Sequence, residues 1–137
     1  FRAYDLNQVY IEDKGSSPSV YNQYIHNYGT RSTDNKILIN VWNYDKNWKV
    51  EAIENGKELA VTRIAAYDPL HILCYDMQRY YNGKMPTSPF VTTKTDHMFE
   101  CTASSATSTV TIKATDGFGN VYTEDMIRPK AFNMNMK

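Results

Sequence analysis

Ile37-Leu38-Ile39-Asn40-Val41-Trp42-Asn43-Tyr44 is the stretch that decides the fold class, because it predicts a strand that is apolar on both faces. After a tight turn at residues 45–47, residues 48–52 alternate apolar and charged side chains, which is the period of a half-buried strand. Asn55-Gly56 follows and gives the strongest short hairpin signal, because both residues accept a positive φ. We therefore expect a three-stranded meander over about residues 37–64.

A second group of strands is predicted further along the chain. Residues 97–101 and 110–114 each alternate apolar and polar side chains, and a turn at residues 116–120 precedes a last strand over 121–128. Residues 1–11 add a further strand. About seven short strands, with turn signals every 8–12 residues or so, predict an all-β fold: an antiparallel β-sandwich of immunoglobulin or fibronectin type.

Two stretches do not fit the strand pattern. Residues 12–35 are polar and predict a surface loop with one strand near 20–25. Residues 65–94 form a long connection, in which Asp68-Pro69 can cap and open a short helix. That helix would place on one side the residues Leu70, Leu73, Cys74 and Met77. We assign residues 1–128 to one domain and residues 129–137 to a flexible tail.

Charge and cysteine content exclude several classes of protein. The 137-residue chain has 15 basic and 15 acidic side chains, whereas nucleic-acid binders and anionic-membrane binders need a basic surplus. No apolar stretch is long enough to span a bilayer.

The chain begins with Phe1, so we expect a processed product or a piece of a longer protein. For Cys74 and Cys101 we expect two free or buried thiols, with one bridge between them as the alternative.

The histidines offer little support for an active site. His26, His71 and His97 are far apart in the sequence, so each is expected to be a surface or hydrogen-bonded histidine. Asp68 and His71 could share one face of a helical turn. A small hydrolase or metal enzyme built on His71 or His97 is the enzymatic alternative. Gly117-Phe118-Gly119 joins two predicted strands and is interpreted as a turn.

Aromatic side chains are more informative. Trp42, Tyr44 and Trp48 surround one predicted turn, and three tyrosines, Tyr75, Tyr80 and Tyr81, lie in the long connection. Such residues can fill a core, dock against a neighbouring domain or stack on a sugar ring. The residues alone leave these alternatives open.

Four motifs together resemble one family. They are Ile39-Asn40-Val41-Trp42-Asn43-Tyr44-Asp45-Lys46-Asn47-Trp48-Lys49-Val50-Glu51, Tyr67-Asp68-Pro69-Leu70, Thr95-Asp96-His97-Met98-Phe99 and Ile112-Lys113-Ala114-Thr115-Asp116-Gly117-Phe118-Gly119-Asn120-Val121-Tyr122-Thr123. In this order they resemble the C-terminal domain of bacterial calcineurin-like metallophosphoesterases. The resemblance covers about residues 37–123.

The resemblance implies an accessory role. In that family a catalytic domain precedes this one and holds two divalent metals through D-x-H, G-D-x-x-(D/E) and G-N-H-(D/E) motifs. None of these motifs occurs in this sequence, and Gly119-Asn120 is followed by Val121. We therefore expect no catalytic residue, metal ligand or cofactor in this chain. The implied partner is the catalytic phosphoesterase domain of the same polypeptide, and the implied location is periplasmic, secreted or at the cell surface.

We expect the domain to pack on that catalytic core and to shape access of substrate. The candidate contact residues are Trp42, Tyr44, Trp48, Asp68, His71, Tyr75, Tyr80 and Tyr81. Burial of both Trp42 and Tyr44 in the sandwich core would remove those two residues from the contact. The alternative function is a stand-alone glycan- or protein-binding module.

Overall fold

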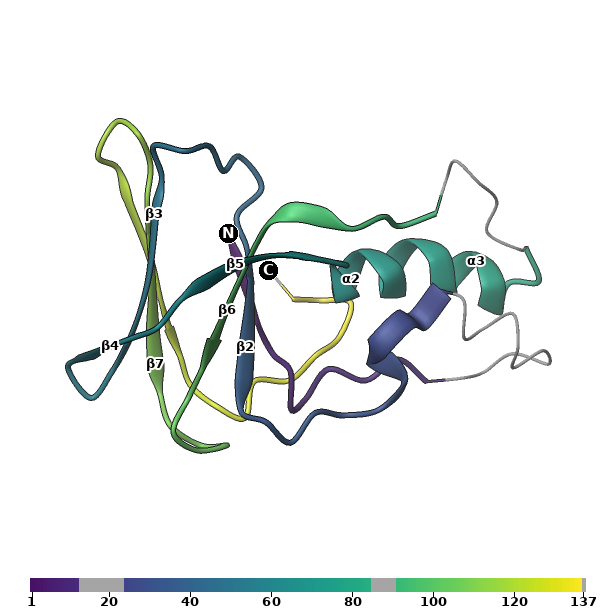
Figure 1. The fold of residues 1–137 in the computed structure, drawn as a ribbon. Helices are drawn as coiled ribbons and strands as arrows, with labels where there is room; N and C mark the ends of the chain where they lie inside the picture. Colours follow the sequence, from purple (N-terminus) through teal and green to yellow (C-terminus); the bar gives the residue numbers. More distant parts are fainter. Residues whose placement is uncertain (13–23, 85–90, 137) are drawn as a thin grey trace.

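The computed structural model describes residues 1–12, 24–84 and 91–136. Its strands form two four-stranded antiparallel sheets that lie face to face (Figure 1). The first sheet contains, in spatial order, β1 (Arg2–Asp5), β2 (Lys36–Asn40), β6 (Thr95–Thr102) and β5 (Thr62–Ala66). The second contains β4 (Lys57–Leu59), β3 (Lys49–Glu54), β7 (Val110–Thr115) and β8 (Val121–Met126). The predicted all-β sandwich is confirmed.

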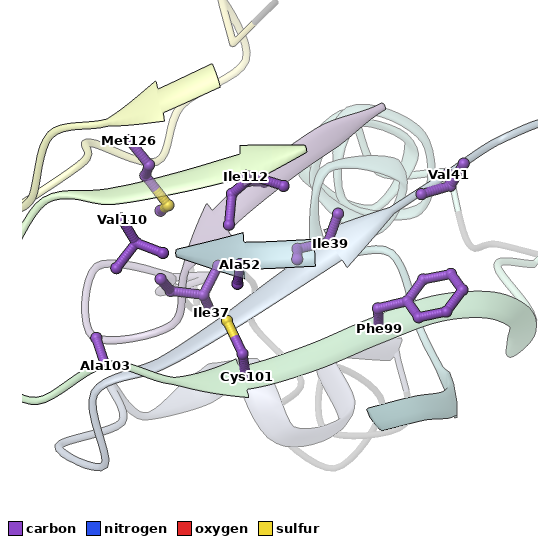
Figure 2. Close-up of a cluster of buried hydrophobic side chains, with 11 residues drawn as sticks. Ile37, Ile39, Val41, Ala52, Phe99, Cys101, Ala103, Val110, Ile112 and Met126 are labelled. Carbon is purple, nitrogen blue, oxygen red and sulfur yellow. The ribbon is translucent and has the colours of Figure 1, made fainter. Parts of the chain in front are cut away.

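The core between the sheets follows from period-two alternation. Ile37 and Ile39 of β2 point toward the second sheet, where Ile112 of β7 faces them (Figure 2). All three side chains are fully buried. The other members of this core are also buried, and they are Ala3, Val41, Ala52, Phe99, Cys101, Ala103, Val110 and Met126.

The outer face of the first sheet is also buried, because a helical layer covers it (Figure 1). This layer runs through α2 (Pro69–His71), the π-helical segment η2 (Ile72–Met77) and α3 (Gln78–Tyr81), with the 3-10 turn η1 (His26–Gly29) beside it. Leu38 of β2 packs in the same cluster as Leu70. The strand is therefore buried on both faces, and the domain's own helix covers the second face.

The helix begins as predicted. The side chain of Asp68 accepts hydrogen bonds from the backbone N–H groups of Leu70 and His71, and Pro69 occupies the first turn. One detail is wrong: Cys74, expected on the apolar side, is exposed, and Ile72 is buried in its place. The cause is the π-helical segment, whose wider turns rotate the buried face away from the 3.6-residue period.

The predicted meander over residues 37–64 is wrong in its pairing. β2 and β3 lie in different sheets, so the turn at residues 45–47 belongs to a crossover between the sheets. β3 and β4 do form the expected hairpin, with Asn55-Gly56 at positive φ. The chain then returns to the first sheet in β5, so the third predicted strand divides into two, and the described residues contain eight strands.

The second group shows the same behaviour. β7 and β8 form the predicted hairpin, whereas β6 pairs with β2 and β5 in the first sheet. Residues 103–109 therefore also cross between the sheets, as residues 41–48 and 60–61 do. Alternation tells which side chains share a face, but both sheets of a sandwich have the same period, so it does not tell which strands pair.

The segments predicted to lack regular structure are partly ordered. Of the strand expected near residues 20–25, residues 20–23 lie outside the described part of the chain, and Ile25 has helical backbone angles rather than extended ones. The predicted flexible tail makes contacts: Phe132 and Met136 pack against the cluster that contains Leu38. The domain boundary at residue 128 stays a prediction.

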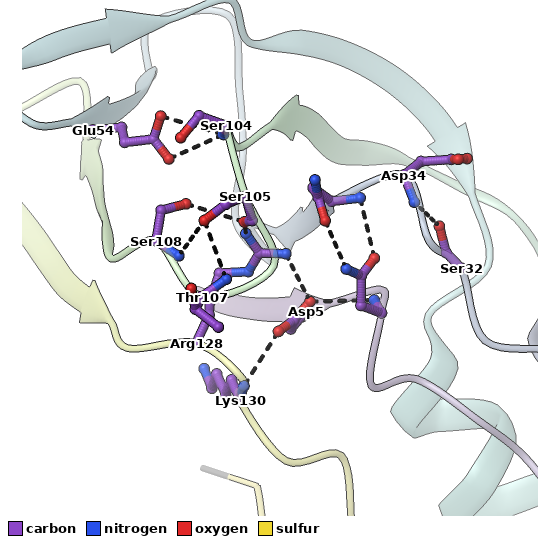
Figure 3. A network of polar contacts seen from close by, with 12 residues as sticks. Asp5, Ser32, Asp34, Glu54, Ser104, Ser105, Thr107, Ser108, Arg128 and Lys130 are labelled. Atoms are coloured by element: carbon purple, nitrogen blue, oxygen red, sulfur yellow. Dashed lines mark hydrogen bonds and ion pairs between the residues drawn. The ribbon is translucent and has the colours of Figure 1, made fainter.

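One end of the sandwich, which we call the closed end, is fastened by buried charges (Figure 3). Asp5 and Arg128 have side chains that are 0% exposed, and Asp5 Oδ1 lies 3.1 Å from Arg128 Nη2. Arg128 Nη1 also donates to the carbonyl oxygen of Ser105 at 2.6 Å. Glu54 accepts a hydrogen bond from the same crossover, residues 103–109. These contacts tie β1, the crossover and the chain after β8 together.

Candidate functional site

The opposite end of the sandwich carries a pocket of about 450 Å³ next to the start of the helix. We call it the Trp42 pocket. Its wall comes from β1 and β2, the crossover that begins at Val41, the start of the helix, and the segment 91–95. The lining residues are Arg2, Asn40, Trp42, Asp68, Leu70, His71, Cys74, Val91, Thr92, Thr93 and Thr95. Three of the predicted contact residues, Trp42, Asp68 and His71, thus meet at one place.

Asp68 is the polar centre that joins the helix to the first sheet. Besides capping the helix, its carboxylate accepts hydrogen bonds from the Tyr4 hydroxyl at 2.7 Å and from the Asn40 side-chain amide at 2.6 Å. The pKa of Tyr4 lies above its ordinary value, mainly because the hydroxyl is buried and secondly because of the negative charge of Asp68. The Tyr4 hydroxyl therefore stays protonated and acts as a donor. All these donors belong to the domain itself, so the role of Asp68 is to hold the start of the helix against the first sheet.

His71 is oriented by its neighbours. Its Nδ1 lies 2.7 Å from the hydroxyl oxygen of Thr92, and the Thr92 backbone N–H donates to buried Asp76 at 3.0 Å. The ring stacks on Tyr75 at 5.2 Å between centroids, and Tyr75 is 40% exposed. Among the described residues, no group of three His, Cys, Asp or Glu side chains could hold a metal ion.

Trp42 is the most prominent side chain of the pocket. It is 50% exposed, and the guanidinium carbon of Arg2 lies 5.1 Å from the centre of its ring. This is the geometry of a cation–π contact. The Nε atom of Arg2 is buried without a hydrogen-bond partner in the described part of the chain. The pair presents a flat aromatic surface with a positive charge beside it.

The other predicted contact residues are not all at this pocket. Tyr44 is partly buried, with its ring edge-on to Phe99 at 4.9 Å. Trp48 is partly buried and stacks on Tyr122 of the second sheet at 6.0 Å. Because Trp42 stays exposed, the condition that would have removed Trp42 and Tyr44 from the contact is not met.

The two tyrosines at the far end of the helix serve the helical layer. Tyr80 is buried in a cluster with Ile72 and Met77, so we leave it out of the candidate surface. The Tyr81 hydroxyl donates to the carbonyl oxygen of Glu12 at 2.6 Å. Their position follows from the length of the helix, which carries residues 78–81 away from the pocket (Figure 1).

Sequence analysis missed several residues at this end. Arg2 and Thr92 carry no recognisable signal in the sequence, because they reach the pocket from strands and segments distant along the chain. Phe118 is 95% exposed in the β7–β8 turn. A large aromatic residue between two glycines in a turn could have indicated an exposed side chain, since a turn tip leaves nothing to bury it.

Both cysteines are free thiols, which confirms the prediction and excludes the bridge. Cys101 is buried in the core, and burial raises its pKa to about 11. Cys74 is exposed and lines the Trp42 pocket, and burial of its sulfur is the first cause of a raised pKa. Neither thiol has the lowered pKa of a nucleophilic cysteine.

Comparison with known families identifies the domain type. A family model described as the C terminal of Calcineurin-like phosphoesterase matches residues 7–122. No curated protein and no solved structure gives a significant match. No helix in the described part of the chain has the length and apolar character needed to cross a membrane.

Proposed function

This chain belongs to the C-terminal family of calcineurin-like phosphoesterases, and from that premise we propose that it is a non-catalytic domain that packs on the catalytic domain. The family description implies a catalytic domain in the same polypeptide. The absence of the family's metal-binding motifs from the sequence supports assigning the chemistry to that other domain. In this proposal, metal-assisted hydrolysis of a phosphoester takes place there.

The observation that carries the proposal is the exposed Trp42 beside Arg2. In a C-terminal domain the catalytic domain comes earlier in the chain, so the polypeptide enters through β1, and Arg2 is the first residue of that strand. The contact between Arg2 and Trp42 places the exposed ring at the point of entry. Tryptophan and arginine are the side chains that most often dominate the binding energy of an interface.

The proposed contact also explains the position of the pocket. Domain interfaces within a chain bury about 600–1,500 Å², which exceeds the area of one side chain and needs several neighbouring groups. His71 and Tyr75 extend the surface along the helix, and both are exposed. A catalytic domain packed here would lie over the Trp42 pocket. We propose that the segment 91–95 then borders the path of the substrate.

Two further properties of the parent enzyme are part of the proposal. We propose that its catalytic domain uses two divalent metals and that the enzyme is secreted or periplasmic, both on the basis of the family resemblance. A secretory signal and the three metal-binding motifs encoded upstream of Phe1 are the expected observations. A coding sequence without them would contradict both properties.

The test uses the full-length enzyme and two matched variants. Trp42→Ala removes the exposed ring, and Tyr10→Ala removes another exposed aromatic side chain, which Arg31 covers at 5.5 Å in the same kind of contact. Hydrogen exchange of residues 41–48 and 91–95 reports on packing, and kcat/KM for a small and a large phosphoester reports on access. We expect Trp42→Ala to increase exchange in both segments and to change the ratio of the two kcat/KM values.

The control variant Tyr10→Ala should leave exchange and both kcat/KM values unchanged. Equal behaviour of the two variants would contradict docking at the Trp42 pocket. In that case, calorimetric titration of the same full-length proteins with a glycan panel decides the alternative. Binding that Trp42→Ala abolishes would favour a glycan-binding module, because the pocket combines an aromatic ring with threonine hydroxyls.

A further inference from the structure

The turn between β7 and β8 presents an aromatic side chain almost entirely to solvent. Phe118 at the tip of this turn is 95% exposed, the largest exposure among the exposed apolar side chains of the described residues. Val121 and Tyr122, at the start of β8, are also about half exposed. An almost fully exposed aromatic side chain in a turn, with further exposed apolar residues next to it in the chain, is a candidate interaction site.

The turn that carries Phe118 is held by its own hydrogen bonds. Asp116 Oδ1 accepts the backbone N–H groups of Phe118 and Asn120, each at 2.9 Å, and Asp116 Oδ2 accepts the Asn120 side-chain amide at 2.8 Å. Gly119 has a φ of +86°, which only glycine adopts readily. Because these contacts fix the backbone of the turn, the position of Phe118 on the surface is pre-organised, and little backbone order has to be gained on binding.

The turn is in contact with the crossover that carries Trp42. A Cβ added to Gly117 would lie 3.0 Å from Cβ of Asn47, so the two loops approach closely and a larger residue would force one of them to shift slightly. Behind them, Trp48 stacks on Tyr122 with an angle of 14° between the rings. We call the exposed end formed by Arg2, Trp42, Trp48, Phe118 and Tyr122 the aromatic end. It includes residues from β1 of the first sheet and from β8 of the second.

We propose that Phe118 is a second anchor, which inserts into an apolar pocket of the catalytic domain of the same polypeptide. This inference rests on the proposed function. The occupant is assigned from continuity: the chain enters at Arg2, Arg2 contacts Trp42, and the crossover with Trp42 contacts the turn of Phe118. One anchor on each sheet fixes the relative orientation of the two domains, whereas a single anchor permits rotation.

The experiment compares three variants of the full-length enzyme. Phe118→Ala removes the second anchor, Trp42→Ala removes the first, and Ile127→Ala is the matched control, because Ile127 is 73% exposed just after β8 at the closed end. The readouts are the rate of limited proteolysis between the domains and the spread of molecular dimensions in small-angle X-ray scattering. We expect Phe118→Ala to raise the cleavage rate about tenfold and to broaden the distribution, with Ile127→Ala within about twofold of the parent.

Each other outcome contradicts a specific statement. If Trp42→Ala loosens the enzyme and Phe118→Ala behaves like Ile127→Ala, the second anchor is wrong and the proposed function stands. If all three variants behave alike, both are wrong. Sedimentation at several concentrations identifies a different occupant: self-association that Phe118→Ala abolishes, with unchanged cleavage between the domains, would assign Phe118 to a contact between two copies.

Discussion

Each end of the sandwich has a crossover in which the chain passes from the first sheet to the second. The two crossovers differ in the side chains that they carry. At the closed end, the crossover over residues 103–109 is held by buried Arg128 and by Glu54 (Figure 3). At the aromatic end, the crossover over residues 41–48 displays Trp42 and supports the turn of Phe118. A buried ion pair therefore marks one end, and exposed aromatic rings mark the other.

The residues that stabilise the fold therefore differ from the residues that are exposed for contact with another domain. A buried ion pair contributes to folding only while both partners are present, because either charge alone is left unsolvated. An exposed aromatic ring contributes little to the stability of its own domain, since folding does not remove it from water. We therefore expect variants of the buried ion pair to destabilise the domain and variants of the exposed aromatic residues to leave its stability nearly unchanged.

The largest effect is expected for Asp5→Ala at the closed end. The variant leaves the guanidinium of Arg128 buried without its carboxylate, so the free energy of unfolding should fall by about 3–5 kcal/mol. Asp96→Ala is the control: it breaks the Arg63–Asp96 pair, which has the similar separation of 2.8 Å but exposed side chains. That pair should contribute less than about 1 kcal/mol. Urea denaturation measures both values, and equal losses would show that burial of the Asp5 pair has no special effect.

A smaller loss of stability is expected for Asp68→Ala, which removes the hydrogen bonds between the start of the helix and the first sheet. The variant removes the helix cap, worth about 1 kcal/mol, and leaves the buried Tyr4 hydroxyl and Asn40 amide without their acceptor. We expect a loss of about 2–4 kcal/mol and faster hydrogen exchange in residues 69–81 than in β2. Asp68→Asn keeps one acceptor oxygen and should lose less. Equal losses for the two variants would contradict this expectation, because they would show that one neutral acceptor oxygen recovers none of the contribution of the carboxylate.

The smallest effect is a pH dependence confined to the β7–β8 turn. Hydrogen bonds from Asn120, then from the backbone of Phe118, hold the pKa of Asp116 below its ordinary value of 3.8. A lowered pKa means that the contribution of the carboxylate is present above that value and is lost as the pH falls through the folded-state pKa. We expect the amide resonances of Phe118 and Asn120 to titrate with a midpoint below 3.8 in NMR spectra. Asn120→Ala should move the midpoint upward, and an unchanged midpoint would contradict the assignment.

Strand positions and faces were predictable because they depend on local alternation. The alternation of Val110, Ile112 and Ala114 and the positive φ at Asn55-Gly56 appear in the structure as expected. Pairing was not predictable in the same way. A crossover and a hairpin loop can have the same polar composition, so the segments at 45–47 and 103–109 gave no sign that the chain changes sheets there.

The candidate site was predictable in part for a similar reason. Trp42 stands out by residue type, and Asp68-Pro69 stands out as a helix start. Arg2 and Thr92 have no such local signature and become relevant only because β1 and the segment 91–95 converge on the helix start. Phe118 was visible in the sequence, but its meaning depends on the close contact between its turn and Asn47.

The sequence by itself determined the β-sandwich class, the helix start at Asp68, the two tight hairpins and the family resemblance, since each depends on residue types at short spacing. Only the tertiary structure decided that the domain's own helix covers the outer face of β2 and that the buried Asp5–Arg128 pair and the exposed Trp42 lie at opposite ends. Those outcomes depend on contacts between residues far apart in the chain, such as Asp5 with Arg128 and Arg2 with Trp42. Local alternation carries no information about such contacts, because a strand with the same pattern can occupy several places in a sandwich with equal burial.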